Sequence, residues 1–373
     1  MAKLKITTIV GTRPEIIRLS EIIKKFDIFF DQRLIHTGQN PHPLLKDIFF
    51  EDLELRDPDL YFGGDHSSLG SFLSNLFICA EKEFMNHRPD AVVILGDTNS
   101  ALSAILAKRV GIPVYHLEAG NRSFDQNVPE EVNRRIVDHT ADFNLVYTEL
   151  ARNNLIAEGL HPRKIALMGS PLNEVLNANK VKINNSKILI DLKLNRKEYI
   201  LVSAHRQENI DFKSRFSMLI ETLEHISKVY KFPVLVSTHP RTRKQIEANG
   251  ISKDLNIIFH DPFNFTDYNH LQQNAYIVLS DSGSISEESA ILGFKALTIR
   301  DSMERPEALE AGSIVMSGIN PQNVLQSLDL VLQNKFTSNI PAEYQISDSS
   351  IRVLNFILST VNQHNFWNSL YNE

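Results

Sequence analysis

Short runs of apolar, often β-branched residues recur along this chain, and each is followed by glycine or polar residues and then by helical spacing. The pattern begins at once, because Ile6–Val10 ends in Gly11 and helical spacing follows from Pro14 to Lys25. The later runs of the first half are Arg33–His36, Ala91–Leu95, Val114–Leu117, Asn144–Tyr147 and Ile165–Met168. Repeated units of strand and helix predict a mostly parallel, doubly wound sheet that binds its ligands in the loops after the strands.

The same pattern starts again after a polar stretch, Asn177–Lys187, which is typical of a linker between domains. The second set of predicted strands is Tyr199–Ser203, Val234–Ser237, Ile257–Phe259, Ala275–Leu279 and Ala296–Ile299. At 373 residues the chain is also too long for one ordinary hydrophobic core. We therefore expect an α/β protein with two Rossmann-like domains, residues 1–176 and 177–348, that face each other across a cleft. The amphipathic segment 349–366 is a candidate for packing back on the first domain.

Composition and charge argue against several classes of protein. The formal net charge of -6 disfavours nucleic acid or an anionic membrane as the main partner. Cys79 is the only cysteine, so the chain forms neither an internal disulfide nor a metal site built from cysteines. The first residues lack the features of a signal peptide, and no apolar run approaches the ~20 residues of a membrane helix. These features predict a cytoplasmic protein.

Charged residues are crowded between His116 and Arg135, directly after a predicted strand. Glu118 follows the apolar run at a place where a helix cap would more often be Ser, Thr or Asp, which favours a functional role. Glu130 and Arg134 are four residues apart on a predicted helix, so a surface ion pair is the alternative for them. Acids beside arginines suit a site that binds an anionic substrate and moves a proton.

Two earlier strand ends carry similar groups. Asp97 comes at the end of the strand Ala91–Leu95, although it or Thr98 could simply cap the next helix. The segment Gly11–Glu15 ends the first strand and opens the first helix, whose backbone amides attract anions. A structural turn with a solvated Arg13 is the alternative. The dinucleotide fingerprint G-x-G-x-x-G is absent at this turn, which weakens an NAD-binding interpretation without excluding it.

Polar and charged residues also follow the predicted strands of the second half. His205 follows one predicted strand and could act as an acid or as a phosphate ligand, although a lone loop histidine is more often neither. His239 follows the next strand, and Arg305 adds a cation later in the chain. The segment Asp281–Glu288 carries small and hydroxyl residues at a helix start, which suits a diphosphate, and Glu288 suits ribose hydroxyls. A plain helix cap with a capping-box glutamate is the alternative.

These motifs together resemble a known family. G-T-R-P-E, L-G-D-T, H-x-E-A-G-x-R, P-E-E-x-N-R, A-H-R-x-E-N, S-D-S-G-x-I-x-E-E and E-R-P-E occur in this order between residues 11 and 307. The chain resembles the non-hydrolysing UDP-N-acetylglucosamine 2-epimerase family over nearly its whole length. Its H-T-G-Q-N, S-T-H-P-R-T-R and G-S-P-L-N-E-V-L segments depart from the glucosamine type and are similar to the UDP-N-acetyl-L-fucosamine synthase branch.

The resemblance implies a GT-B-like fold, a homodimer, and no metal or nicotinamide cofactor. It implies elimination of UDP from a UDP-N-acetylhexosamine to a 2-acetamidoglycal, followed by re-addition that inverts C2. The acidic catalytic positions of the family match Asp97, Glu118 and Glu130. Positions near the diphosphate match Arg13, Arg134 and His205, and the uridine diphosphate loop matches Ser282, Gly283 and Glu288. Arg18 stands where glucosamine-type enzymes commonly have lysine, and Ser284 replaces the second glycine of the usual S-G-G motif.

Several alternatives stay open at this point. UDP-N-acetyl-L-rhamnosamine is the preferred substrate, with UDP-N-acetylglucosamine as the alternative. A GT-B glycosyltransferase would share the fold and the nucleotide loop, but sugar transfer needs one base at most, and the segment from Glu118 to Glu130 is rich in acids. A binding module without turnover and a hydrolysing epimerase that releases free sugar are the other readings.

Overall fold

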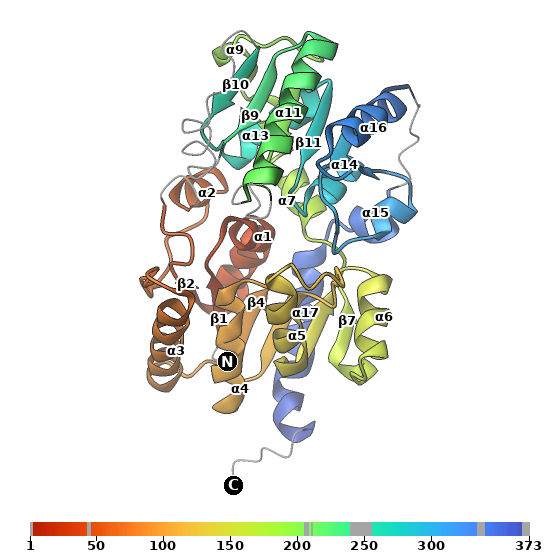
Figure 1. The fold of residues 1–373 in the computed structure, drawn as a ribbon. Coiled ribbons are helices and arrows are strands. Elements are labelled where there is room, and N and C mark those ends of the chain that lie inside the picture. Colours follow the sequence, from red (N-terminus) through yellow and green to blue (C-terminus); the bar gives the residue numbers. More distant parts are fainter. Residues whose placement is uncertain are drawn as a thin grey trace. The chain divides into compact units, whose positions relative to one another are not determined.

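The structure is a computed structural model that describes residues 3–42, 46–204, 209, 212–238, 256–333 and 340–367 (Figure 1). The chain divides into two compact units. Unit 1 is Met1–Ala178 together with Gln345–Glu373, and unit 2 is Asn179–Tyr344, so unit 2 is inserted into unit 1 along the chain. Each unit has its own parallel sheet and its own hydrophobic core.

Within the described residues, unit 1 contains a seven-stranded sheet with the order β3-β2-β1-β4-β5-β6-β7. All neighbouring strands in it are parallel. The strands are β1 (Lys5–Val10), β2 (Asp31–His36), β3 (Leu60–Tyr61), β4 (Ala91–Leu95), β5 (Val114–Ala119), β6 (Phe143–Val146) and β7 (Ile165–Leu167). Every residue of β4 is buried, as expected for a parallel sheet covered on both faces.

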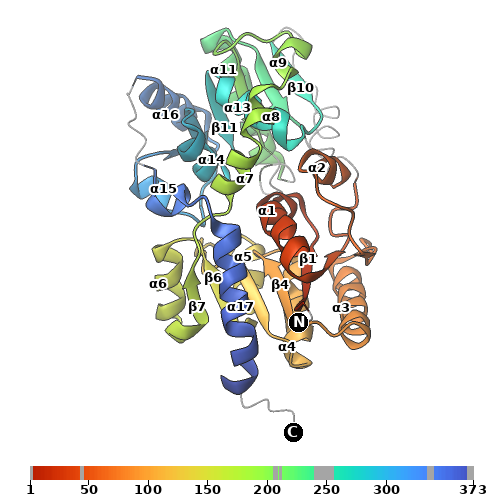
Figure 2. The same ribbon diagram turned by 180° about the vertical axis from the view of Figure 1, so that it is seen from behind.

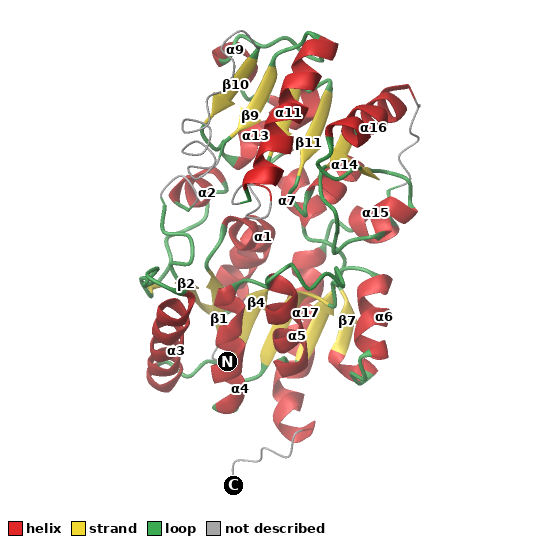
Figure 3. Ribbon diagram, in the orientation of Figure 1, coloured by secondary structure: helices red, strands yellow, loops and turns green. Residues whose placement is uncertain are grey.

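Helices cover the faces of this sheet (Figure 3). The helical elements of unit 1 before the insertion are α1 (Arg13–Phe29), α2 (Asp47–Asp52), α3 (Leu69–Asn86), α4 (Ala104–Arg109), α5 (Glu130–Thr140), α6 (Glu149–Ala157), α7 (Leu172–Ala178), and the 3-10 turns η2 (Asn99–Ser103) and η3 (Pro162–Lys164). On one face, Phe72 and Leu76 of α3 join Ile9 of β1 and Val92 of β4 in one apolar cluster. This burial fixes the strands whose ends carry the predicted site residues.

The last described helix, α17 (Ser349–Trp367), belongs to unit 1 although it follows all of unit 2 in the chain (Figure 2). It packs beside α1. Its buried apolar residues are Val353, Leu354, Ile357 and Val361. The hydroxyl oxygens of Tyr115 on β5 and Thr360 on α17 are 2.8 Å apart, so this helix is bonded to the centre of the sheet as well as packed on it.

Unit 2 has a six-stranded parallel sheet within the described residues, with the order β10-β9-β8-β11-β12-β13. Its strands are β8 (Ile200–Ser203), β9 (Val234–Ser237), β10 (Ile257–His260), β11 (Ile277–Ser280), β12 (Ala296–Thr298) and β13 (Val315–Met316). Its helices are α8 (Lys180–Asn184), α9 (Ile188–Asp191), α11 (Lys213–Tyr230), α13 (Phe265–Asn274), α14 (Ile285–Leu292), α15 (Glu307–Glu310), α16 (Pro321–Gln333) and the 3-10 turn η4 (Ala342–Gln345). None of the helices in the described part of the chain is both long and apolar enough to cross a bilayer.

The direction of the chain across each sheet reverses at one place. This switch point lies between β1 and β4 in unit 1 and between β8 and β11 in unit 2. In parallel α/β sheets, ligands bind beyond the carboxyl ends of the strands at such a point. The predicted α/β fold with two parallel sheets is confirmed, and the predicted strands of both halves are present.

Two features differ from the predictions. The sheet-edge strands β3 and β13 were not predicted, because two partly exposed residues are too few to show a strand pattern. The stretch Asn177–Lys187, predicted as a linker, includes the end of α7 and all of α8. Ile183 is buried in α8, and its carbonyl accepts a hydrogen bond from His270 Nδ1 of unit 2 (2.7 Å). The polar composition therefore hides a short helix attached to unit 2.

Candidate active site

The turn after β1 is packed so closely that it requires glycine. A Cβ atom on Gly11 would lie 2.0 Å from the Ser100 hydroxyl oxygen and 2.3 Å from that of Thr37. These two hydroxyls are themselves 2.7 Å apart. Gln39 Oε1 accepts hydrogen bonds from the Ser100 amide (3.0 Å) and hydroxyl (2.9 Å). The ends of β1, β2 and β4 are thus joined at the carboxyl edge of the sheet.

Glu15, in the first turn of α1, fills the place where an anion was expected. Its Oε2 accepts hydrogen bonds from the amides of Gly11 (2.9 Å) and Thr12 (2.7 Å) and from the Thr12 hydroxyl (2.8 Å). Its Oε1 accepts from the Thr98 hydroxyl (2.9 Å). Burial raises the pKa of Glu15 to about 7, against the opposing effect of these hydrogen bonds. An internal carboxylate therefore accepts the hydrogen bonds of the Gly11 and Thr12 amides, and anion binding by this turn stays a prediction.

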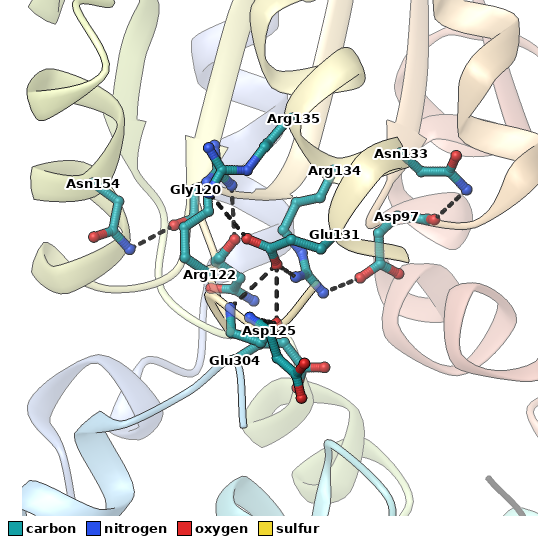
Figure 4. Close-up of polar contacts among 12 residues, drawn as sticks. Asp97, Gly120, Arg122, Asp125, Glu131, Asn133, Arg134, Arg135, Asn154 and Glu304 are labelled. Carbon is teal, nitrogen blue, oxygen red and sulfur yellow. Dashed lines mark hydrogen bonds and ion pairs between the residues drawn. The ribbon is translucent and has the colours of Figure 1, made fainter. Parts of the chain in front are cut away.

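Asp97 and Arg134, two of the predicted site residues, form an ion pair (Figure 4). Asp97 follows Gly96, whose φ of +72° turns the chain at the end of β4. Arg134 lies on α5 and is buried, with one guanidinium nitrogen on Asp97 and another on Glu131. Asn133, one residue earlier on α5, donates to the Asp97 carbonyl (3.0 Å). Helix α5 therefore holds both the backbone and the carboxylate of Asp97.

The two neighbouring glutamates at the start of α5 have different environments. Glu130, the predicted catalytic acid, is exposed, whereas Glu131 is buried. Glu131 Oε2 accepts from the Ser123 amide (3.2 Å) and hydroxyl (3.1 Å) as well as from Arg134. Figure 4 shows Glu131 between the side chains of Arg134 and Arg135. Glu131 is therefore held in place by neighbouring side chains and backbone. The exposed side chain of Glu130 is accessible to a substrate.

Glu118, at the end of β5, has a backbone conformation that side chains rarely adopt. Its φ is +64°, and the pairing of β5 with β6 shifts register between Leu117 and Ala119. Such strain persists where the surroundings hold it, and it is concentrated at functional sites. Glu118 Oε2 lies 3.4 Å from Nε of Arg18, which is buried on α1. The Arg18 guanidinium carbon also lies 5.6 Å from the centre of the Tyr147 ring.

Arg13 begins α1 and is half-buried, with its guanidinium carbon 5.8 Å from the centre of the Phe49 ring on α2. Within unit 1 the structure therefore brings predicted residues together as two pairs, Arg18 with Glu118 and Asp97 with Arg134. Glu118 lies at the end of β5 and Asp97 follows β4, whereas Arg18 and Arg134 lie on helices α1 and α5.

A buried polar network supports this edge from below. His116 Nε2 is 2.8 Å from the Gly96 carbonyl oxygen, and its Nδ1 is 3.0 Å from Asp138 Oδ1. Asp138 Oδ2 accepts from Arg122 (2.7 Å), and Arg122 makes a two-bond pair with Glu158 (2.7 and 2.6 Å). The hydrogen bond from Arg122 is the main cause that lowers the pKa of Glu158 to about 2. The network ties the turn before Asp97 to β5, α5 and α6.

In unit 2, the loop after β11 is held by its own hydroxyls and by Arg305. The Ser282 and Ser284 hydroxyl oxygens are 2.9 Å apart, so Ser284 bonds within the loop where the family pattern has glycine. Arg305, predicted as a substrate-binding cation, is buried and donates to the Gly283 carbonyl (2.7 Å). A Cβ on Gly283 would lie 3.0 Å from this guanidinium. Arg305 therefore holds the backbone of the loop at Gly283.

Two further contacts fix the surroundings of this loop. Glu288, predicted to bind ribose, is buried on α14 and accepts a hydrogen bond from Gln272 Nε2 of α13 (2.5 Å). Asp281 is fully buried, and its Oδ2 accepts from Asn209 (3.0 Å), which lies beyond β8. Asn209 Oδ1 in turn accepts from Arg215 Nη2 (2.9 Å). The Asn209–Asp281 bond therefore spans the switch point of unit 2.

Two predicted residues, His205 and His239, lie outside the described part of the chain. Among the residues that the structure describes, no group of three or more His, Cys, Asp or Glu side chains could hold a metal ion.

Sequence reasoning missed several residues that the structure places at this edge. The turn motif alone gives Glu15 no role of its own, although its separation from Thr12 fits a capping box, which is a signal that can identify it. His116 and Asp138 were not singled out, because an apolar strand and a polar helix gave no sign that they pair. Arg122 lies within the charged segment from His116 to Arg135, and the sequence does not indicate its partner.

Comparison with known proteins identifies a consistent set of relatives. A family model described as UDP-N-acetylglucosamine 2-epimerase matches residues 24–358. A UDP-N-acetylglucosamine 2-epimerase of Methanocaldococcus jannaschii is 35% identical over 349 residues, which cover 89% of this chain and 93% of that protein. The structure of UDP-N-acetylglucosamine 2-epimerase from Rickettsia bellii is similar with a TM-score of 0.91 and 41% identity, covering 97% of this chain and 98% of that one.

A second solved structure, the M. jannaschii UDP-GlcNAc 2-epimerase in complex with UDP-GlcNAc and UDP, is similar with a TM-score of 0.89 and 33% identity. The similarity covers 95% of this chain and 100% of that one.

Proposed function

We propose that this chain, which belongs to the UDP-N-acetylglucosamine 2-epimerase family, inverts the configuration at C2 of a UDP-linked N-acetylhexosamine. Members of the family are isomerases, and this chain is an isomerase of the same kind. The observation that carries the proposal is the pairing of carboxylates with guanidinium groups beyond the carboxyl edge of unit 1, Arg18 with Glu118 and Asp97 with Arg134. Carboxylates can move protons, and guanidinium groups can bind an anionic leaving group or hold the carboxylates in place.

The chemistry explains why one acid is insufficient. The C2 proton of an N-acetylhexosamine is not adjacent to a carbonyl, so direct removal gives no stabilised carbanion. If the anomeric diphosphate departs first, C1 becomes oxocarbenium-like and the C2–H bond becomes acidic. Loss of that proton gives a 2-acetamidoglycal with its double bond between C1 and C2. Re-addition of UDP at C1, with a proton delivered to the other face of C2, gives the epimer.

The size of the barrier that must be lowered indicates that several residues share the catalysis. One positioned acid or base contributes a factor of about 10²–10⁴, or about 3–5 kcal/mol. Enzymes commonly lower barriers by about 8 kcal/mol or more. Stabilisation of the departing diphosphate by fixed cations supplies the larger electrostatic share. A site with both carboxylates and guanidinium groups therefore fits the reaction better than a site with either alone.

We assign proton transfer at C2 to Glu118, Asp97 and Glu130, without fixing which residue serves which face. Arg13, Arg134 and His205 are assigned to the diphosphate. In this assignment His205 can also donate a proton to the diphosphate as it leaves C1. The buried contacts of Arg18 support a different task for it, the orientation of Glu118.

We assign uridine diphosphate binding to the loop after β11 and to Glu288 of α14. Ser282, Gly283 and Ser284 are small residues just before α14, and a helix N-terminus suits a diphosphate. His239 is assigned to the same ligand. Arg305, which donates to the Gly283 carbonyl from its buried position, is assigned to the shape of the loop.

For the sugar, we propose UDP-N-acetyl-L-rhamnosamine, converted to UDP-N-acetyl-L-fucosamine. The support is the sequence of segments such as Gly169–Leu176, which begins with the loop after β7, continues into α7 and departs from the glucosamine type. Ser170 in this loop is buried, and its hydroxyl accepts from the Leu172 amide (3.2 Å). Interconversion of UDP-N-acetylglucosamine and UDP-N-acetylmannosamine is the alternative.

The test is incubation with each UDP-sugar in D₂O, followed by NMR of deuterium at C2 and of its configuration. The expected result is deuterium in both epimers, with the UDP linkage retained. Deuterium in epimers of one sugar pair only identifies the substrate. Free sugar and UDP as products would instead indicate a hydrolysing epimerase. Transfer of sugar to an acceptor without C2 exchange would indicate a glycosyltransferase.

We also propose that the chain forms a homodimer. Ile78 and Met85 lie two turns apart on α3 and are 66% and 69% exposed, which supports a partner surface there. Analytical ultracentrifugation over a range of protein concentrations tests this, and a monomer at all concentrations would overturn it.

A further inference from the structure

Glu15 is unusual because one buried carboxylate accepts four hydrogen bonds from two different turns. Three of these bonds come from the turn after β1, from the amides of Gly11 and Thr12 and from the Thr12 hydroxyl. The fourth comes from Thr98, in the turn after β4. Glu15 is only 1% exposed, so these donors replace water for the whole carboxylate. An acid buried in this way is costly unless its hydrogen bonds are complete.

The two turns flank the switch point of unit 1, since β1 and β4 are the neighbouring strands there. Each turn continues directly into a residue that the proposed function uses. Thr12 precedes Arg13, the first residue of α1, and Thr98 follows Asp97. A shift of Glu15 would therefore be passed to both neighbours through bonds of 2.7–2.9 Å.

We propose that Glu15 is a positioning residue that fastens the turn carrying Arg13 to the turn carrying Asp97. The inference rests on the proposed function, because it gives these two residues their tasks at the substrate. Glu15 itself is buried and is not proposed to touch the substrate.

The chemistry of the four donors determines which substitutions are informative. The amides of Gly11 and Thr12 can only donate, so Oε2 must remain an acceptor. The Thr98 hydroxyl can donate or accept, so the Oε1 side tolerates either a carboxylate oxygen or an N–H group. Glutamine can satisfy both sides by placing its carbonyl on the amides and its NH₂ on Thr98. Alanine satisfies neither.

The protonation behaviour of Glu15 agrees with this arrangement. Burial raises its pKa to about 7, so the neutral acid is accessible near neutrality. In the neutral acid the proton fits only on Oε1, where the Thr98 hydroxyl can turn and accept it. Glu15→Gln reproduces that neutral form.

The decisive variant is Thr98→Val, which keeps the shape of the side chain and removes only the bond to Glu15. Its matched control is Thr8→Val, because Thr8 is a buried threonine of β1 whose hydroxyl donates to Gln32 on β2 (2.9 Å) and not to Glu15. Thr98→Ser restores the hydroxyl. Glu15→Gln and Glu15→Ala complete the set.

Two readouts are needed. The first is hydrogen–deuterium exchange of backbone segments 9–14 and 96–100 in the full chain. We expect Thr98→Val and Glu15→Ala to speed exchange in both segments by about tenfold or more, and Thr8→Val to leave them unchanged. Acceleration confined to the mutated segment, or equal acceleration in the Thr8→Val control, would overturn the proposal. This readout does not depend on any activity.

The second readout is steady-state epimerisation. We expect Thr98→Val to lower kcat about tenfold with KM within about twofold, and Thr98→Ser and Glu15→Gln to stay within about threefold of the wild type. Wild-type kcat in Thr98→Val would overturn the inference. If the wild type itself exchanged no C2 hydrogen with any UDP-sugar, the proposed function would fail, and the exchange of the backbone segments would still decide whether Glu15 joins the two turns.

Discussion

Arg18 and Glu118 lie 3.4 Å apart, although one is on the first helix and the other ends the fifth strand. Arg18 is buried, and the Glu118 side chain is 13% exposed. The acid therefore has access to solvent, and it also contacts the buried arginine. The positive φ of Glu118 turns its backbone out of the regular strand, and the ion pair fixes one side-chain direction. This arrangement resembles that of many catalytic acids and bases, whose orientation depends on a second group.

Substitution of Arg18 is expected to reduce turnover more than binding. Arg18→Met removes the group that orients Glu118, and we expect kcat to fall by about 10–100-fold with KM within about threefold. Arg18→Lys keeps the charge but loses the planar guanidinium, so its loss should be smaller. Arg152→Met is the control, because the Arg152 side chain pairs with Glu149 at the surface of α6. Equal kcat in Arg18→Met and in the control would contradict this role.

The adjacent acids Glu130 and Glu131 are expected to respond in opposite ways. Glu131 is buried among Ser123 and Arg134, so Glu131→Gln should lower the free energy of unfolding by about 1–3 kcal/mol. Glu130 is exposed, so Glu130→Gln should leave stability within about 0.5 kcal/mol while solvent exchange at C2 falls by about 10²-fold or more. Urea denaturation and NMR in D₂O measure the two effects. Unchanged C2 exchange in Glu130→Gln would remove it from proton transfer.

The raised pKa of Glu15 predicts how stability depends on pH. The ordinary value is 4.5 and the folded value is about 7, so between these values the folded protein keeps a proton that the unfolded chain releases. The contribution of Glu15 to the free energy of unfolding is therefore complete below pH 4.5. It is lost as the pH rises to 7, which lowers the free energy of unfolding by up to about 3 kcal/mol. Glu15→Gln cannot titrate and should show a flatter profile in denaturation at pH 5, 6 and 7. Parallel profiles for the two proteins would show that Glu15 is ionised throughout.

Arg305 is expected to affect nucleotide affinity through the loop. Arg305→Gln removes the bond from the guanidinium to the Gly283 carbonyl, so the backbone of the loop Ser282–Ser284 is held less firmly. We expect the Kd for UDP to rise about tenfold, as measured by isothermal titration calorimetry. Arg196→Gln, at an exposed position of unit 2, is the control. An unchanged Kd in Arg305→Gln would show that the loop holds its shape without this residue.

Much of the fold could be predicted because strands and helices alternate with clear hydrophobic patterns. The order of the strands was not determined by the pattern, and it decides which loops meet. Glu15 and Thr98 are far apart in sequence, and only the neighbouring positions of β1 and β4 bring them together. The candidate site was predicted where charge followed directly on a strand, as for Asp97 and Glu118. Both carboxylates lie beside arginines in the structure, and their roles at a site stay predictions.

The remaining differences have local causes. Glu130 and Glu131 both fall in the first turn of α5, and the sequence does not show which of them faces inward. The answer depends on the irregular loop before the helix, which carries Ser123 to the Glu131 carboxylate. Arg305 stays a predicted substrate-binding cation, and the sequence gives no sign that its guanidinium also bonds to the loop backbone.

The position of α17 has a consequence for how the protein is made. Unit 2 is complete once residue 344 has left the ribosome, and domains generally fold as they emerge. Folding of unit 1 is completed later, although its first residues are translated first. The sheet of unit 1 lacks the cover of Val353, Leu354 and Ile357 until α17 has been translated. A chain terminated early, before residue 349, would release a finished unit 2 joined to a unit 1 whose apolar face is bare, and such a product is a natural target for aggregation and proteolysis.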